Sequence, residues 1–378
     1  MDQTIILLCN LVAVDSVNPS LVPGGAGEAG VAALIAAEMR AIGLDVEMSE
    51  AAPGRPNVIG ILEGRRAGRS LMFCGHMDTV GVAGMGAPFD PVVRDGRLYG
   101  RGAQDMKGGL AAMLGAARTV ASRGGLPAGR LIIAAVADEE YASLGAEALA
   151  RAWNADAAVV PEPTDMVIAT GHKGFTWVEI VTEGIAAHGS RPGDGRDAIL
   201  RMGRVLTRLE TLDRHLQSMA PNPVMGTASL HASLISGGRE LSTYPDRCVL
   251  QMERRSVTGE GEGTALSEVD AVLAALRSED AEFVASARVM FDRRPYETPA
   301  GHFLIPALED AIRATGGIPS RGGVSFWTDA AVLGHAGTPS VIFGPGGAGL
   351  HGTDEWVKLD EVLACRDALA ELARIVCI

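Results

Sequence analysis

Two kinds of hydrophobic pattern alternate over the first 170 or so residues. Short runs such as 130–137 are apolar at nearly every position, which is typical of a strand buried on both faces. Between these runs, apolar residues recur at helical spacing. We expect strands at 57–62, 71–74, 130–137 and 157–160, and helices at 28–42, 106–123 and 145–153. This order predicts an α/β fold whose mostly parallel sheet carries helices on both faces.

The pattern changes after Lys173. Apolar and polar residues now alternate, as they do in strands with one exposed face. Strands are expected at 175–183, 228–235, 247–255 and 282–291, and helices at 197–212 and 264–277. The order β-α-β-β-α-β is the split βαβ arrangement, one small sheet with two helices on a single face. We therefore expect an inserted α+β, ferredoxin-like domain at 174–293.

After Pro295 the first pattern returns, with a helix expected at 302–315, a buried strand at 339–343, a loop at 344–349 and a last helix at 359–377. The first domain is thus predicted to be split into 1–173 and 294–378. The chain has 378 residues, of which 47% are hydrophobic, so it can build two cores.

Charge and cysteine usage narrow the function classes. The formal charge of −13 argues against nucleic acid or an anionic membrane as partner, and an anionic substrate would need a local positive site. Five scattered cysteines without CxxC spacing argue against a disulfide framework or a structural zinc site. The first apolar run is too short for a signal peptide, and no segment reaches membrane-spanning length. We expect a cytoplasmic protein.

Histidines and carboxylates follow the expected strands. His76 and Asp78 come just after the strand at 71–74, and alternate residues of an extended strand point the same way. Asp78 can then accept a hydrogen bond from the ring nitrogen that does not bind metal. An ordinary surface loop explains the same spacing equally well.

Asp105 precedes a helix in a glycine-rich segment. Its carboxylate can bridge two ions, or it can cap the helix N-terminus. Asp138, Glu139 and Glu140 follow the most apolar strand, where adjacent acids are costly unless a cation compensates them. One glutamate can bind metal while the other acts as a general base; a solvated acidic turn is the alternative.

Glu162 follows the strand at 157–160, and His351 follows the strand and loop at 339–349. Ligand sites of open α/β sheets gather outside the carboxyl ends of the strands. These positions are therefore expected to come together.

With these residues in view, the chain resembles the acetylornithine deacetylase / succinyl-diaminopimelate desuccinylase / aminoacylase / glutamate carboxypeptidase family of two-metal amidohydrolases. The resemblance covers essentially the whole chain. It rests on Gly75-His-Met-Asp-Thr-Val80, Gly100-Arg-Gly-Ala-Gln-Asp105-Met-Lys-Gly-Gly109, Asp138-Glu-Glu140, Glu162-Pro-Thr164, Ala187-His188-Gly-Ser190 and His351-Gly-Thr-Asp-Glu-Trp-Val357.

The resemblance implies roles for these residues. His76 and Glu162 would hold one metal ion, Glu140 and His351 the other, and Asp105 would bridge them. Asp78 would support His76, and Glu139 would be the general base and acid. His188, on an inserted lid and dimerisation domain, would stabilise the oxyanion, and Arg255 would bind a substrate carboxylate. Zinc suits this donor set best, and cobalt or manganese also fit.

One segment departs from the family pattern. Many relatives carry an asparagine before the lid strand, where this chain has Thr243. A threonine hydroxyl has one donor hydrogen where the amide has two. The inherited contact at this position is therefore in doubt, and a different acyl group is one explanation.

We expect metal-dependent hydrolysis of an N-acyl amino acid or a related small amide by a homodimer. A dipeptidase or carboxypeptidase using the same site is the rival within the enzyme class. A catalytically silent metal-binding protein is the rival outside it, and the presence of Glu139 argues against it. A scaffold with structural zinc is the third alternative, although such sites are usually rich in cysteine thiolates.

Overall fold

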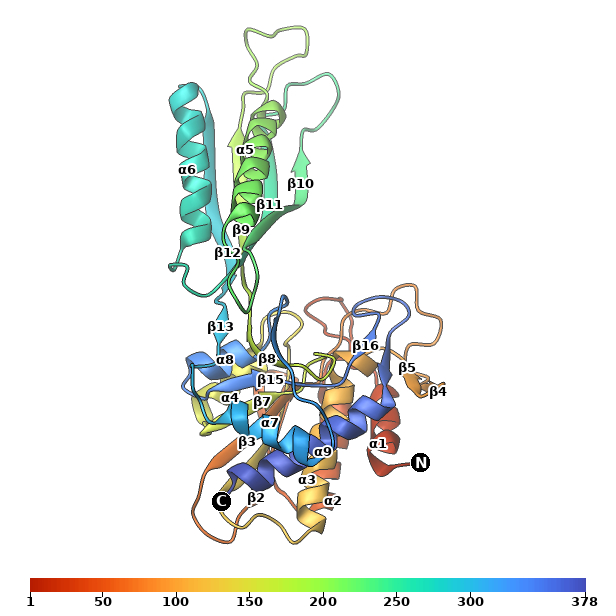
Figure 1. The fold of residues 1–378 in the computed structure, drawn as a ribbon. Helices are drawn as coiled ribbons and strands as arrows, with labels where there is room; N and C mark the ends of the chain where they lie inside the picture. Colours follow the sequence, from red (N-terminus) through yellow and green to blue (C-terminus); the bar gives the residue numbers. More distant parts are fainter. The chain divides into compact units, whose positions relative to one another are not determined.

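A computed structural model describes all residues from 1 to 378 (Figure 1). The chain forms two compact units. The first comprises Met1–Gly171, Glu297–Gly323 and Thr328–Ile378, and the second comprises His172–Tyr296 with Val324–Trp327. The insertion expected at 174–293 lies inside the second unit.

A nine-stranded mixed sheet is the centre of the first unit, with strands in the order β1-β2-β6-β3-β7-β15-β8-β13 and with β14 on β8. The four strands β6, β3, β7 and β15 are parallel, and β1, β2 and β8 pair antiparallel on either side. The strands are β1 (Asp45–Ala52), β2 (Arg55–Glu63), β3 (Ser70–His76), β6 (Arg130–Val136), β7 (Ala157–Val160), β8 (Ile168–His172), β13 (Tyr296–Glu297), β14 (Arg321–Val324) and β15 (Ser340–Ile342).

Helices cover both faces of this sheet. On one face, α3 packs against α1 and α9, α7 packs against α9, and α2 packs against β2. On the other, α4 contacts α8, β1, β2 and β6. Successive residues of the parallel strands point to opposite faces, so Leu131 and Ile133 join the core on the first face and Ile132 does not. The helices are α1 (Gln3–Val12), α2 (Ala29–Ile42), α3 (Gly108–Ser122), α4 (Leu144–Ala152), α7 (Leu304–Ala314), α8 (Ala330–His335) and α9 (Leu359–Val376).

A second, small sheet of the first unit has the order β16-β17-β5-β4. It comprises β4 (Val92–Arg94), β5 (Arg97–Tyr99), β16 (Gly347–Ala348) and β17 (Trp356–Lys358). The loop expected at 344–349 is therefore wrong in part, because β16 lies within it. Its two residues are a strand only by pairing with Val357 and Trp356, and a local hydrophobic pattern does not contain that pairing.

The second unit is a four-stranded antiparallel sheet in the order β10-β11-β9-β12, built from β9 (Gly174–Glu183), β10 (Ser229–Gly237), β11 (Arg247–Ser256) and β12 (Val284–Arg293). The helices α5 (Ala198–Ser218) and α6 (Thr264–Glu279) pack against it (Figure 1). They enclose a separate core that includes Ile180, Leu250 and Leu273. The predicted fold class, an α/β domain with an inserted ferredoxin-like domain, is confirmed. No helix in the molecule has both the length and the apolar composition to cross a membrane.

Candidate metal centre

The ends of three adjacent parallel strands carry the predicted site residues. His76 is the last residue of β3, Glu139 and Glu140 follow β6, and Glu162 follows β7. Because β6, β3 and β7 are parallel neighbours, their carboxyl ends lie at one edge of the sheet. The side chains that follow these strands therefore converge.

Hydrogen bonds at both ring nitrogens fix the orientation of His76. Its Nδ1 lies 3.0 Å from the backbone oxygen of Asp78, and a carbonyl oxygen can only accept, so Nδ1 carries a proton. Its Nε2 is 3.0 Å from Asp105 Oδ1 and 3.7 Å from Glu162 Oε1. The ring is 1% exposed. This orientation points Nε2 at the carboxylates, as a metal-binding histidine requires.

Asp105 lies between the two histidines. It sits in an irregular turn (Ala103–Lys107) before α3, where Asp105 and Met106 have non-helical backbone angles and the peptide bond between them is cis. Its Oδ1 approaches His76, and its Oδ2 is 3.4 Å from His351 Nε2. The N-cap position of α3 belongs to Lys107, so the capping alternative for Asp105 is wrong.

Glu140 and His351 form the other half of the cluster. Glu140 Oε2 is 3.2 Å from His351 Nε2, and His351 lies between β16 and β17 with a left-handed φ of 58°. One ligand atom each from His76, Asp105 and Glu140 lie within 4.8 Å of one another. The five predicted metal ligands are thus brought together within the first unit.

Burial and mutual repulsion perturb the acids. Burial raises the pKa of Glu139 and Glu162 well above the usual range, and the charge of neighbouring carboxylates raises it further. The pKa of Glu140 rises to about 7, chiefly through burial and also through Asp105. Burial would raise the pKa of Asp105 as well, but hydrogen bonds from His351 and His76 hold it below its usual value.

The donor set fits divalent cations. Two imidazoles and three carboxylates converge, and buried carboxylates at this density are costly without a compensating positive charge. Glu140 Oε1 is buried and has no hydrogen-bond partner. An acceptor in that state is satisfied by a bound cation, so the residues present are suited to hold metal.

Asp78 supports the site through a contact other than the one expected, in which its carboxylate would accept a hydrogen bond from the His76 ring. Its carboxylate lies 3.6 Å from His76 Nδ1, and the closer contact is made by its backbone oxygen. The two carboxylate oxygens instead accept the backbone N–H groups of Glu139, at 3.1 Å, and Glu140, at 3.2 Å. Asp78 therefore holds the backbone of the acidic turn.

Glu355 is a residue that the sequence reasoning missed. It is 1% exposed, and its carboxylate accepts the backbone N–H groups of Gly102, Gln104 and Asp105 at 2.9–3.1 Å. Arg101 also donates to it at 2.6 Å. Glu355 thus fixes the loop that presents Asp105. The available signal was its place in the motif that begins at His351.

His188 and Thr243 belong to the second unit. They pair through an isolated antiparallel bridge, and the exposed ring of His188 accepts at Nδ1 from the backbone N–H of Ser190 at 3.2 Å. The Thr243 hydroxyl donates to Glu240 at 2.6 Å. The departure at Thr243 therefore lies directly beside the predicted oxyanion residue.

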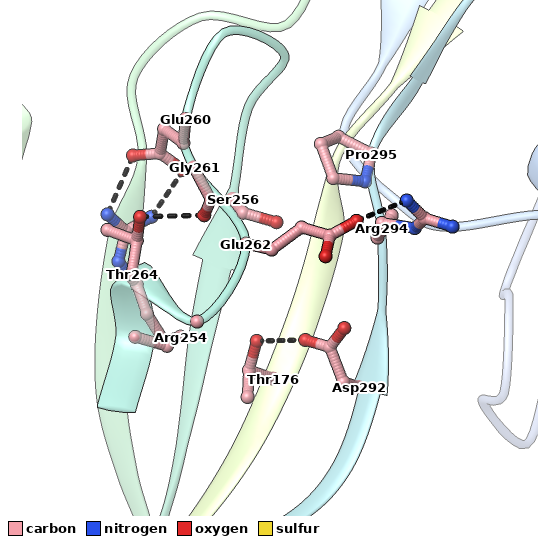
Figure 2. A pocket seen from close by; sticks show the side chains of 12 residues that line it. Thr176, Arg254, Ser256, Glu260, Gly261, Glu262, Thr264, Asp292, Arg294 and Pro295 are labelled. Carbon is pink, nitrogen blue, oxygen red and sulfur yellow. Dashed lines mark hydrogen bonds and ion pairs between the residues drawn. The ribbon is translucent and has the colours of Figure 1, made fainter. Parts of the chain in front are cut away.

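Two adjacent arginines of β11 have different environments. Arg254 is buried and pairs with Glu260 and Glu268. Arg254 and Glu260 line a small cavity of about 60 Å³ (Figure 2). This cavity is small beside ligand pockets, which usually exceed about 300 Å³. Arg255 points to the opposite face, is 30% exposed, and donates through Nε to Glu253 at 2.6 Å. Arg255 is the arginine with N–H groups available to a ligand.

Comparison with known proteins agrees with this geometry. A family model described as peptidase family M20/M25/M40 matches residues 72–375. The chain belongs to this family. The match spans the metal cluster and the second unit.

Curated relatives extend the match. An acetylornithine deacetylase from Myxococcus xanthus is 30% identical over 361 residues, with 90% of each chain covered. A succinyl-diaminopimelate desuccinylase from Gluconacetobacter diazotrophicus is 30% identical, with 93% of this chain and 92% of the relative covered. An N-formyl-4-amino-5-aminomethyl-2-methylpyrimidine deformylase from Bacillus subtilis is 28% identical, with 88% and 86% covered. With such relatives, this member of the M20 family is an amide-bond hydrolase.

Solved structures share the fold. A tripeptidase from Staphylococcus aureus superposes with a TM-score of 0.83 at 21% identity, covering 99% of this chain and 98% of that one. An M20 family metallo-carboxypeptidase from Sulfolobus solfataricus gives 0.80 at 16% identity, covering 100% and 99%. At sequence identities this low, the similarity to these structures shows a shared fold and nothing about substrate.

Proposed function

We propose that this M20 hydrolase uses two metal ions to remove the acyl group from an N-acyl amino acid or a closely related small amide. The observation that carries the proposal is the position of Asp105, whose two oxygens face His76 and His351. That is the arrangement expected of a carboxylate shared by two ions. His76 with Glu162, and Glu140 with His351, supply the remaining ligands.

When bound, two divalent ions would lower the pKa of a shared water and polarise the scissile carbonyl. The protein residues then have separate tasks. Glu139 takes the proton of the attacking water at its carboxylate and delivers it to the leaving amine. Its raised pKa in the metal-free chain suits a group that holds a proton during the reaction. His188 donates to the oxyanion, and Arg255 binds the substrate carboxylate.

Zinc is the proposed metal, because nitrogen and carboxylate donors without thiolate suit it, and cobalt or manganese would also be held. We also propose a homodimer that forms through the second unit, and a cytoplasmic location. Five cysteines without a disulfide, four of them buried, are compatible with a reducing compartment.

A substrate panel tests the proposed class. N-acetyl, N-succinyl and N-formyl amino acids would be compared with unblocked dipeptides by the release of free amine. The proposal predicts that at least one N-acyl series is cleaved with a higher kcat/KM than every dipeptide. Faster cleavage of dipeptides would assign the same site to a peptidase.

A further inference from the structure

A buried polar network lies behind the turn that carries Glu139 and Glu140. It joins the segment before α2, the start of β2 and the residues after β3 and β6, which are far apart in the sequence. Its members Asn18, Glu28, Asp78 and Asp138 are fully buried, and Arg55 is 7% exposed. The metal cluster and the general-base proposal use only Asp78 from this set.

Arg55 is the cation of the network. Its Nε and Nη2 each donate to the carboxylate of Glu28 at 2.6 Å, and Nη2 also donates to Asp138 Oδ1 at 2.9 Å. A buried ion pair of this geometry is strongly coupled, because removal of one partner leaves an uncompensated charge. Arg55 therefore compensates two buried carboxylates together.

Asn18 connects this ion pair to the site. Its Nδ2 donates to Asp138 Oδ1 at 3.0 Å and to Asp78 Oδ2 at 2.7 Å. Asp78 in turn accepts the backbone N–H groups of Glu139 and Glu140. The Asn18 amide thus joins Asp138, the first residue of the acidic turn, to Asp78, which binds the backbone of the next two residues.

Asp138 is held through its backbone N–H, its C=O and one carboxylate oxygen in a conformation that is uncommon for a residue with a side chain. Its φ is 69°, in the left-handed region. Its N–H donates to Glu28 at 3.1 Å, and its C=O accepts the N–H of Ser143 at 2.6 Å. Backbone strain of this kind persists only where the surroundings determine it. The conformation of Asp138 sets the direction in which the next two side chains leave the turn.

We propose that Arg55, Glu28 and Asn18 are positioning residues that fix the Asp138–Glu140 turn and so direct Glu139 toward the reacting water and Glu140 toward the metal. This inference rests on the proposed function for the task of Glu139. The positioning itself is a property of the folded chain before any metal or substrate is bound. Supporting partners of metal ligands typically change metal affinity or activity by about 10–100-fold.

Three variants separate positioning from simple stabilisation. Arg55→Met removes the cation. The charge-neutral pair Arg55→Met with Glu28→Gln removes both charges and keeps an acceptor for the Asp138 N–H. Asn18→Leu leaves the ion pair and breaks the link to Asp78. Arg151→Met is the matched control, because Arg151 makes an exposed helical ion pair with Glu147.

The first readout is hydrogen exchange of the peptide that spans 137–143 in the metal-free protein, below the melting temperature of each variant. We expect faster exchange at Glu139 and Glu140 in all three variants and wild-type exchange in the control. On metal reloading, we expect a metal affinity and a kcat about 10–100-fold lower, with KM changed much less. Arg55→Lys should recover part of the loss, since it restores the charge without the fork.

If the double variant Arg55→Met with Glu28→Gln shows the hydrogen exchange and the kcat of the wild type, the proposal is wrong. The network would then act only as an ion pair that stabilises the fold. If the wild-type protein cleaves no amide, the proposed function fails, while exchange and metal affinity still decide the positioning role by the same comparison.

Discussion

Glu139 is the residue on which the proposed chemistry depends most. It stands beside Glu140, a proposed metal ligand, and its backbone N–H is fixed by Asp78. Burial raises its pKa, and a positive charge bound at the neighbouring ligands would lower it toward the working range.

Replacement by glutamine tests this role. Glu139→Gln keeps the shape and removes the proton acceptor, so kcat should fall by about 10²–10⁴-fold while the metal content stays at the wild-type value. Steady-state kinetics with metal analysis of the same sample measures both. Turnover close to the wild-type rate would remove Glu139 from the general-base role.

Protonation of the ligands predicts how metal binding depends on pH. In the metal-free chain, hydrogen bonds to Asp105 and Glu140 raise the pKa of His351 to about 10, and the pKa of Glu140 is about 7. A metal ligand must be deprotonated, so binding releases protons. Apparent affinity should therefore rise from pH 6 to pH 8 by about tenfold per unit for each proton displaced.

Isothermal titration calorimetry in buffers of different ionisation enthalpy counts those protons. A metal affinity that does not change between pH 6 and pH 8, with a binding enthalpy that is the same in every buffer, would contradict the protonated states of His351 and Glu140.

At the scale of single residues, the sequence predicted the candidate ligands but not the residues that hold them in place. The candidate metal ligands lie at the ends of buried strands or just after them. Binding sites of open α/β sheets form at the carboxyl ends of the strands, and this rule was enough to predict that His76, Glu140 and Glu162 lie close together. The partners that hold them are Asn18, Arg55 and Glu355. These contacts cross 60–250 positions of sequence, and a local pattern does not contain them.

At the scale of elements, the close approach of α3 to the segment after β7 positions Glu162 in the site. Gly109, in the first turn of α3, lies against Pro161, which precedes Glu162. A Cβ at Gly109 would fall 2.0 Å from the Pro161 carbonyl oxygen. Only glycine allows this contact.

Gly109→Ala should therefore destabilise the protein by about 1–3 kcal/mol through overpacking, and it should also weaken metal binding by displacing Glu162. The control is Gly203→Ala, because Gly203 is an exposed helix residue of α5 with no atom within 4 Å of an added Cβ. The control should gain about 0.4–1 kcal/mol. Chemical denaturation measures the free energy of unfolding of the two variants. Equal stability of the two variants would contradict the close contact between Gly109 and Pro161.

The elements that the sequence predicted are those with a continuous or periodic hydrophobic pattern between recognisable turns. The strand expected at 157–160 is β7, and the helix expected at 28–42 is α2 with one residue fewer. Most of the missed strands are short or exposed, but the helix α1 and the mostly buried strand β8 were missed as well. The strand β1 has mostly exposed side chains, and β4 and β16 have three and two residues. Such strands exist because of their partners, so their own sequence carries little signal.

At the scale of the whole molecule, the second unit offers a surface for the proposed dimer. The strand β10 is an edge of its sheet, and Leu234 and Ile235 on it are 66% and 55% exposed. Exposed apolar edge strands tend to pair with another chain. A two-fold axis at this edge would extend the sheet across two copies.

Ile235→Lys should shift the protein from dimer to monomer in light scattering after size-exclusion chromatography. Val284→Lys is the matched control on β12, the opposite edge strand, where Val284 is 48% exposed. The control should remain a dimer. A monomeric wild-type protein, or a dimer lost only in the control, would contradict the proposed interface.

The most direct test of the two-metal centre is a metal titration of activity. The chain would be stripped with a chelator and reloaded stepwise with zinc, cobalt or manganese, and release of amine from the preferred N-acyl amino acid would be followed. We expect no turnover in the stripped protein and full turnover at about two equivalents per chain, as a shared Asp105 carboxylate requires. Undiminished turnover in the stripped protein, or no metal binding at all, would contradict the assignment of His76, Asp105, Glu140, Glu162 and His351.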